Sequence, residues 1–191
     1  MDTPLPLPET VNLALQIAQS TNQRVVLLTC GVSGSGKSTL SQAILTQYPN
    51  SIRLSIDAFI FEKYGVFGKG YKEEGYERLQ EEARGWVSGK LLEVVREGMR
   101  DVVLDLSFWS KRSRDEYWEL VQDEGKGKYG VELVVFRGSE EVIWRRLRRR
   151  EENWEKEGMG EGRPVGRELF GRFLAGFEWP EGEGEIVVEV V

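Results

Sequence analysis

The sequence of 191 residues contains no histidine and a single cysteine, Cys30. Without histidine, the chain cannot form a Ser–His–Asp triad, a histidine general base or a histidine metal site. One cysteine cannot form an intramolecular disulfide or a zinc site built from several cysteines. We expect Cys30 to be a small buried strand residue and not a nucleophile. If the chain catalyses proton transfer, a carboxylate is the available base.

The sequence also lacks a long hydrophobic run. No apolar stretch approaches the roughly 18 residues that a membrane span needs. The first ten residues, MDTPLPLPET, have neither the positive region nor the apolar region of a secretory signal. We therefore expect a cytoplasmic protein with no membrane partner. The formal net charge of −6 gives no overall attraction to nucleic acid, although a local basic patch could provide one.

The length and composition suit one folded domain. Hydrophobic residues make up 40% of the chain and charged residues 30%, so disorder is not expected. A chain of this size buries roughly 70% of its extended surface, which is enough for a sizeable core. Prolines alternate with leucines at the start, which predicts an extended arm followed by a helix over residues 1–22. Residues 23–191 are expected to form a single domain.

Apolar runs alternate with segments of helical periodicity. The runs predict strands at 24–30, 51–56, 101–106, 131–136 and 186–190. Helices are predicted after Thr10, around Leu40 to Tyr48, and at 73–97, 111–124, 139–152 and 164–177, whereas 58–72 and 157–163 are expected to be irregular. This alternation is typical of an α/β fold of three layers, with a mostly parallel five-stranded sheet flanked by helices.

Between the first strand and its helix lies the sequence Gly31-Val-Ser-Gly-Ser-Gly-Lys-Ser38. It matches the phosphate-binding loop (P-loop) pattern G-x-x-x-x-G-K-[ST]. Its glycines let the backbone N–H groups point into one concavity, and the following helix adds its positive N-terminus. Lys37 can reach the β- and γ-phosphates, and Ser38 offers a hydroxyl to Mg²⁺. The residues predicted to bind ATP are Gly31, Ser33, Gly34, Ser35, Gly36, Lys37, Ser38 and Thr39.

A P-loop indicates phosphates but not a reaction. The sequence has no Asn-Lys-x-Asp for guanine, no Asp-x-x-Gly after the third strand and no Leu-Ser-Gly-Gly-Gln of a transporter ATPase. It is also too short for an oligomeric motor with a helical lid domain. These absences leave the compact kinase-like group.

Several segments resemble the small P-loop kinases related to polynucleotide kinase, zeta toxin and chloramphenicol phosphotransferase. The resemblance covers about residues 25–190 and rests on GVSGSGKSTL, LSID (54–57), VVLDLSFW (102–109) and WRRLRRR (144–150), in that order. It implies a nucleoside-kinase-like fold with a lid, and phosphoryl transfer from ATP. It leaves the acceptor open.

Two aspartates follow the second and third predicted strands. Asp57 is expected at the end of the second strand, beside the P-loop strand, where the resemblance implies the base for the acceptor hydroxyl. The alternative is an aspartate that caps the next segment. Asp105 ends the run VVLD, where a carboxylate suits Mg²⁺ or its water shell, or orients the acceptor. The alternative is a strand-end aspartate that binds loop amides.

Five arginines surround Leu147 near the end of a predicted helix. Most of them could offset the helix dipole and pair with the two glutamates that follow. In the related kinases, the segment at 157–163 is a lid over the phosphates. The resemblance therefore implies that Arg150 in first place, and Arg163 in second, stabilises charge on the transferred phosphoryl group.

Residues 59–76 combine six aromatic residues with three lysines. They could line an acceptor pocket, stack the bases of a single strand, or pack beneath a mobile segment. Phe108 and Trp109, which follow Asp105, are expected to add to the same cleft. Trp179 lies where the related kinases contact the base, although packing explains it as well.

Together these features predict an enzyme that uses ATP and Mg²⁺ to phosphorylate a hydroxyl of a small-molecule or nucleotide-like acceptor. One alternative is a polynucleotide 5′-hydroxyl kinase, which the acidic composition does not favour. Another is a nucleotide-binding regulatory protein without transferase activity. The acceptor and the oligomeric state stay open.

Overall fold

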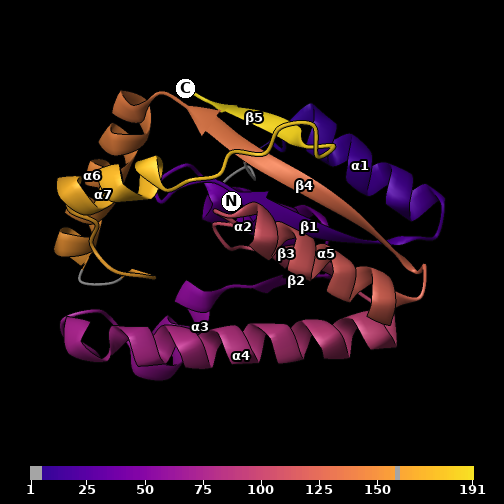
Figure 1. Cartoon of the computed structure of the whole chain (residues 1–191), viewed down its shortest axis with the longest axis horizontal. Helices are drawn as coiled ribbons and strands as arrows, with labels where there is room; N and C mark the ends of the chain where they lie inside the picture. The colour runs from indigo at the N-terminus through magenta and orange to yellow at the C-terminus, as the bar shows by residue number, and fades with distance from the viewer. Residues whose placement is uncertain (1–5, 158–159) are drawn as a thin grey trace.

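The computed structural model describes residues 6–157 and 160–191, which form five strands and seven helices (Figure 1). The strands are β1 Arg24–Cys30, β2 Ser51–Leu54, β3 Asp101–Leu104, β4 Tyr129–Gly138 and β5 Ile186–Val190. They form one sheet in the order β2-β3-β1-β4-β5, and every neighbouring pair among them is parallel. The predicted α/β fold with a five-stranded parallel sheet is confirmed.

The helices are α1 Glu9–Ser20, α2 Lys37–Gln47, α3 Ile56–Tyr64, α4 Glu73–Glu97, α5 Lys111–Gly125, α6 Glu140–Glu157 and α7 Arg167–Ala175. Because crossovers between parallel strands are right-handed, α2 lies on one face of the sheet, and α4 and α5 lie on the other. In Figure 1, α6 and α7 lie together at the end where β4 terminates, and α3 lies beside the start of α4 at the same end.

The main core is built around β1, whose residues from Val25 to Cys30 are all buried. A strand that is apolar on both faces belongs in the centre of a parallel sheet, which explains its continuous hydrophobic run. Thr29 is the polar member of this run. Its hydroxyl donates to the carbonyls of Leu104 and Leu106, at 3.1 and 3.0 Å. It therefore ties the end of β1 to the end of β3, where the site lies.

A second, smaller cluster of buried side chains lies between α3 and α4. It consists of Ile60, Tyr71, Tyr76, Leu79 and Ala83. The rings of Tyr71 and Tyr76 stack with centroids 5.8 Å apart. This cluster fixes α3 against α4.

Several predicted boundaries were wrong. The segment 58–72, expected to be irregular, contains most of α3, because Ser55 caps a helix there by accepting from the amide of Ala58 at 3.3 Å. The second and third strands end two residues earlier than predicted. In addition, β3 lies between β1 and β2, so the second strand is at the sheet edge and not beside the P-loop strand.

The first helix and the last two helices also differ from the prediction. Helix α1 begins at Glu9, with Pro8 and not Thr10 at its N-cap. Helix α6 continues five residues beyond the predicted end, into the segment expected to be a lid. Helix α7 begins at Arg167, three residues after Pro164. The rest of the predicted arm, residues 1–5, and part of the predicted lid, residues 158–159, lie outside the described residues.

None of the helices in the described ranges is both long and apolar enough to cross a membrane.

Candidate active site

The P-loop connects β1 to α2 at the carboxyl edge of the sheet. Gly36 is the N-cap residue of α2 and has a φ of 110°, a conformation that favours glycine. Gly34 has a φ of 85°, and a Cβ atom there would come within 3.1 Å of the Leu147 Cβ atom. Glycine at this position therefore lets α6 pack directly on the loop. The loop and the arginine-rich helix form one structural unit.

Lys37 opens α2, and its ammonium group folds back over its own loop. Nζ donates to the carbonyls of Gly31 and Val32, at 2.9 and 3.0 Å. Loss of water around the ammonium lowers the pKa of Lys37, while the nearby carboxylates of Asp105 and Asp57 oppose this shift. Two neutral carbonyls at the start of the P-loop thus hold the ammonium group.

The other predicted nucleotide ligands differ in exposure. Ser38 and Thr39 are exposed in the first turn of α2, and Ser33 is half-buried. Ser35 is 1% exposed, and its hydroxyl has no hydrogen-bond partner among the described residues. The Ser35 side chain is thus enclosed beneath the loop, and the Ser38 hydroxyl is open to a ligand.

Asp57, the predicted base, lies in the first turn of α3 and not at the end of a strand. Its side chain is accessible to solvent, and residues of α4 and of the segment before α7 lie close to its carboxylate. The Tyr76 hydroxyl donates to Oδ1 at 3.4 Å. A Cβ atom on Gly162 would lie 3.1 Å from Oδ2, so the segment before α7 passes close to one side of this carboxylate. Loss of water and the Asp105 carboxylate raise the pKa of Asp57, while Lys37 and Arg150 oppose this shift.

Asp105 follows β3, and its amide donates to the carbonyl of Leu54 at 2.9 Å. Its Oδ2 atom accepts a hydrogen bond from Nε of Arg53 at 2.8 Å and forms an ion pair with Nη2 at 2.6 Å. The same guanidinium pairs with Glu161 of the predicted lid. The sequence analysis did not identify Arg53 or Glu161. In the sequence, Arg53 is only a polar residue in a strand that alternates apolar and polar residues. Glu161 is one of many glutamates.

Arg150 is the lid arginine that lies nearest to the P-loop. Its Nη2 atom is 3.5 Å from the Ser33 hydroxyl, and its guanidinium lies over the Trp154 ring at 4.5 Å. Its Nε atom is buried and has no hydrogen-bond partner in the described part of the chain. Burial lowers the pKa of Arg150. This guanidinium points at the loop without a paired carboxylate among the described residues.

Arg146, Arg148 and Arg163 have partners other than the P-loop. Ile143 and Leu147 of α6 are fully buried, as their spacing predicts. Arg148 pairs with Glu151 at 2.7 Å, and Arg146 donates to the Val191 carbonyl at 2.8 Å. Arg163 pairs with Glu73 and lies over the Tyr76 ring at 4.9 Å. Arg163 therefore lies close to Asp57 and anchors the segment before α7 to α4.

Most aromatic residues of the segment 59–76 belong to the second cluster or pack against it. Phe59 stacks on Trp86 at 4.9 Å, and Tyr71 and Tyr76 are less than 10% exposed. Phe108 is buried in the main core and does not add to a cleft. Of the three roles considered for this segment, packing accounts for most of its rings. Tyr76 is the exception, since its hydroxyl reaches Asp57.

Burial raises the pKa of the Cys30 thiol to about 11. At neutral pH the thiol is protonated, and it donates to the Phe108 carbonyl at 3.4 Å. This agrees with the prediction of a buried strand residue.

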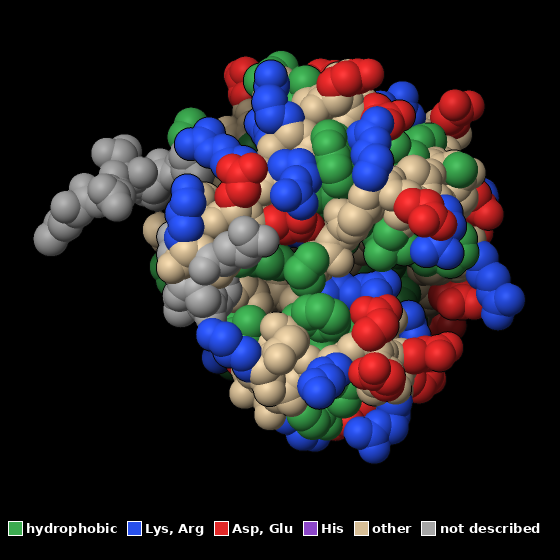
Figure 2. All heavy atoms as spheres, turned by 90° about the vertical axis from the view of Figure 1, so that its left-hand side faces the viewer, with side chains coloured by type: hydrophobic (Ala, Val, Ile, Leu, Met, Phe, Trp, Pro, Cys, Tyr) green, Lys and Arg blue, Asp and Glu red, His purple; other side chains and the backbone are tan. Residues whose placement is uncertain are grey.

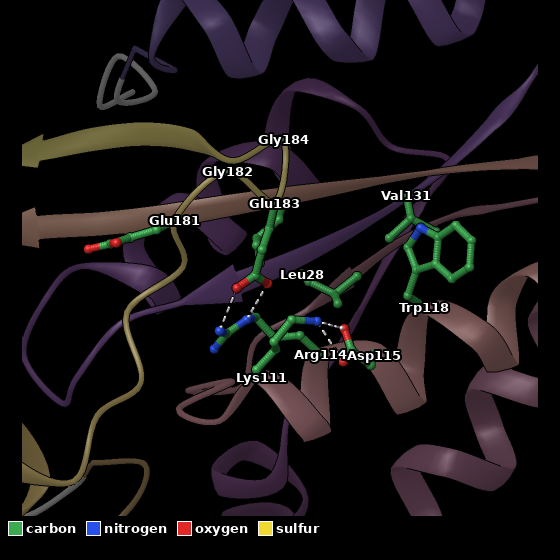
Figure 3. A pocket seen from close by; sticks show the side chains of 11 residues that line it. Leu28, Lys111, Arg114, Asp115, Trp118, Val131, Glu181, Gly182, Glu183 and Gly184 are labelled. Carbon is green, nitrogen blue, oxygen red and sulfur yellow. Dashed lines mark hydrogen bonds and ion pairs between the residues drawn. The ribbon is translucent and has the colours of Figure 1, made fainter.

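A pocket of about 410 Å³ lies between α5, the sheet and the loop before β5 (Figure 3). Its floor contains Leu28 and Leu133, and Trp118 forms part of its wall. Arg114 pairs there with Glu183 at 2.8 Å. None of the described residues that line it is a predicted site residue. The pocket is therefore separate from the P-loop site.

The carboxyl edge of the sheet thus brings together Lys37, Asp57, Asp105 and Arg150, which come from four different elements or loops. Figure 2 looks at this end of the molecule, where basic, acidic and hydrophobic side chains surround a hollow near the middle of the face. Strand ends of parallel sheets are where ligands of α/β folds bind.

A family model described as AAA domain matches residues 26–180. The chain belongs to this family of small P-loop kinase-like proteins.

Three solved structures have the same fold. A presumed kinase from Chloroflexus aurantiacus matches with a TM-score of 0.63 and 17% identity, over 88% of this chain and 85% of that chain. A chain of the Pnkp1/Rnl/Hen1 RNA repair complex matches with a TM-score of 0.61 and 17% identity, over 81% and 44%. Chaetomium thermophilum Kti12, solved with ADP-AlF3, matches with a TM-score of 0.56 and 14% identity, over 86% and 87%. These likenesses show the fold.

The P-loop kinase-like family implies Mg²⁺ together with the nucleotide. Within the described residues, no group of three or more carboxylate or thiol side chains could hold a metal ion alone. Mg²⁺ takes few protein ligands and shares its shell with phosphates and water. The exposed hydroxyl of Ser38 and the carboxylate of Asp105 are hard oxygen donors that suit such a shared site.

Proposed function

We propose that this protein is a kinase that transfers the γ-phosphoryl group of ATP to a hydroxyl of a small-molecule or nucleotide-like acceptor. One observation carries the proposal: three groups share one edge of the sheet. They are a P-loop with its lysine, an arginine with no paired carboxylate among the described residues, and an accessible carboxylate. Phosphoryl transfer depends mainly on positioning and on stabilising the charge of the transferred group. These residues provide both.

Each cation has a distinct task in this proposal. The loop amides and the N-terminus of α2 bind the phosphates, and Lys37 exchanges its two carbonyl partners for phosphate oxygens. Arg150 neutralises charge on the γ-phosphoryl group, and the 3.5 Å contact with Ser33 already directs it to the loop. Arg163 lies over the ring of Tyr76, whose hydroxyl contacts Asp57. Its task would be to hold the segment before α7 in place.

Asp57 accepts the proton of the acceptor hydroxyl. A base works best when its pKa lies near the working pH, and both the enclosed position and the Asp105 charge raise the pKa of Asp57. The Tyr76 hydroxyl fixes the carboxylate by donating to Oδ1 and leaves Oδ2 for the acceptor. Since the chain has no histidine, this carboxylate is the base that the site offers.

Ser38, and Asp105 directly or through water, would hold the Mg²⁺ that accompanies ATP. The ion would supply positive charge to the phosphate oxygens. Asp105 itself is kept in place by Arg53, which contacts only its Oδ2 atom.

Transfer to a panel of hydroxyl compounds tests the proposal, with the phosphorylated product detected by mass spectrometry. The wild type should phosphorylate at least one acceptor, and Lys37→Ala should lower that rate at least about 100-fold. The matched control is Lys90→Ala, because Lys90 is on the surface of α4 and pairs with Glu93 at 2.6 Å. Equal transfer by Lys37→Ala and the wild type would overturn the proposal. ATP binding without transfer to any acceptor would instead favour a regulatory protein.

A polynucleotide 5′-hydroxyl kinase is the second candidate, favoured by the likeness to a chain of an RNA repair complex and by three exposed lysines, Lys63, Lys69 and Lys72. Binding of a labelled single strand should then weaken steeply as salt concentration rises. Binding that is absent, or insensitive to salt, would contradict this candidate.

A further inference from the structure

Arg53 holds two carboxylates at the same time, and its side chain is 7% exposed. One partner is Asp105, which comes from the neighbouring strand and is fixed by its backbone hydrogen bond to β2. The other is Glu161, whose Oε1 and Oε2 atoms accept from Nη1 and Nη2 at 3.0 and 2.7 Å. Two parallel bonds of this kind are how a guanidinium binds a carboxylate or phosphate. Arg53 is therefore a prepared anion site, and Glu161 occupies it.

The residue after Glu161 lies close to the predicted base. Gly162 has a φ of 86°, and a Cβ atom there would lie 3.1 Å from Oδ2 of Asp57. The carbonyl of Gly162 accepts from the Tyr71 hydroxyl at 3.1 Å, which holds the segment in this position. A hydroxyl that approaches the exposed Asp57 at Oδ2 therefore passes beside Gly162. Because Glu161 is the adjacent residue, the approaching acceptor also comes close to the pair between Glu161 and Arg53.

Removal of Glu161 changes the charge balance around Arg53. The guanidinium keeps Asp105 but loses the partner that its Nη1–Nη2 edge contacts. With a neutral acceptor, only water would contact the Nη1–Nη2 edge of Arg53, and the two bonds to Glu161 would be lost without replacement. An acceptor with its own carboxylate or phosphate would replace Glu161 with a group of the same charge and geometry.

We infer that Arg53 is the subsite for an anionic group on the acceptor, and that Glu161 fills this subsite until the acceptor arrives. This inference rests on the proposed function. The acceptor class is then a hydroxyl compound that carries a carboxylate or a phosphate a few bonds from the reacting hydroxyl. Arg53 acts as a binding and specificity residue, and Glu161 as an internal competitor of the acceptor.

Binding measurements on the full chain test this inference without using transfer. Excess ADP fills the P-loop, and calorimetry then compares matched probes: adenosine with adenosine 3′-monophosphate, and glycerol with glycerate and glycerol 3-phosphate. Glu161→Gln removes the competing charge and should tighten binding of a charged probe about tenfold. The neutral probes should bind equally to both proteins. Comparison of glycerate with glycerol 3-phosphate shows whether a carboxylate or a phosphate fits.

Two further variants complete the experiment. Arg53→Lys keeps the charge but loses the paired geometry, and should weaken binding of the charged probe at least about tenfold. Glu152→Gln, an exposed glutamate on α6, is the matched control and should change nothing. If Arg53→Lys fails to fold, Glu161→Gln still decides, because it leaves the pair between Arg53 and Asp105 intact.

The inference is overturned if Glu161→Gln binds no charged probe more tightly than the wild type does, or if it tightens neutral probes equally. Failure of the proposed function has a different signature: charged probes would bind through Arg53, but no acceptor would be phosphorylated.

Discussion

Lys37, Asp57 and Arg150 differ from the paired charges on the surface of the protein. Surface charges such as Lys111 and Asp115 pair with each other at 2.7 Å. By contrast, Lys37 binds carbonyls, Asp57 accepts one long hydrogen bond, and Arg150 contacts a serine and a tryptophan ring. Charged groups that are enclosed but not neutralised by each other are typical of ligand sites.

Substitution of Asp57 by asparagine should raise stability. The pKa of Asp57 is raised in the folded protein, so the native state binds this proton more tightly than the unfolded state does. The carboxylate therefore lowers stability as the pH rises from the unfolded pKa, near 3.8, through the folded value. At pH 7 we expect Asp57→Asn to melt about 1–3 °C higher than the wild type, a modest effect because the side chain is accessible to water.

Thermal unfolding from pH 3.5 to 8 checks this expectation, with Asp123→Asn on the surface of α5 as control. The gap between Asp57→Asn and the wild type should shrink toward low pH, where Asp57 is protonated in both states. A variant less stable than the wild type at pH 7 would contradict the assigned environment of Asp57.

Arg150→Ala should weaken nucleotide binding about tenfold and lower the rate of phosphoryl transfer further, because its guanidinium points at the P-loop. Arg149→Ala is the matched control, since Arg149 is the exposed neighbour on the same helix. Titration of both variants with a fluorescent ATP analogue measures the difference. Equal affinities of the two variants for the ATP analogue would show that Arg150 does not bind the nucleotide.

At the residue scale, the sequence identified the members of the site that stand in or beside recognisable patterns. The P-loop residues carry their chemistry in their spacing, and Asp57 and Asp105 follow apolar runs. Arg53 and Glu161 could not be found this way, because their roles arise from contacts between residues 52 and 108 positions apart. Tyr76 was identified only as one of six aromatic residues in the segment 59–76, and its contact with Asp57 was not predicted. Such contacts depend on the order of strands in the sheet.

At the element scale, α3 is the part of the fold that the sequence analysis missed. Its aromatic residues and the glycines after it obscure the pattern of nine helical residues. The available signal was Ser55, followed by an aspartate in the first turn, which is a common helix start. The five strands were easier to predict, since a short apolar run between two helical segments is typical of a buried parallel strand.

Ser55→Ala should destabilise the protein by about 1 kcal/mol, because it removes the cap of α3. It should also lower the rate of phosphoryl transfer, since α3 carries Asp57 in its first turn. Urea unfolding and transfer assays measure both effects. Ser110→Ala, which removes the corresponding cap of α5, is the control: it should cost similar stability but leave transfer unchanged. Equal effects of the two variants on transfer would contradict a special role for α3.

At the scale of the whole molecule, Arg114 joins α5 to the segment before β5. It pairs with Glu183 at 2.8 Å (Figure 3). It also donates to the carbonyls of Phe108 and Glu178, both at 2.9 Å. Its side chain is 4% exposed. These contacts lie at the pocket between α5 and the loop before β5, which is separate from the P-loop site. We therefore expect Arg114 to stabilise the folded protein.

Arg114→Met should cost about 2–4 kcal/mol of unfolding free energy, because it leaves Glu183 and two carbonyls without their donor. Arg112→Met is the control, since Arg112 is exposed and pairs with Glu116 on the same helix; it should leave the unfolding free energy nearly unchanged. Urea unfolding separates the two. A small loss for both variants would show that the segment before β5 is held by other contacts.

The central claim is that the P-loop and Asp57 form one phosphoryl-transfer site. The most direct test measures ATP affinity and single-turnover phosphoryl transfer in the same sample of Asp57→Asn, with an acceptor that the wild type phosphorylates. The expected result is ATP affinity within about threefold of the wild type, with transfer lowered at least about 100-fold. Transfer at the wild-type rate, or an equal loss of ATP binding and transfer, would contradict the claim.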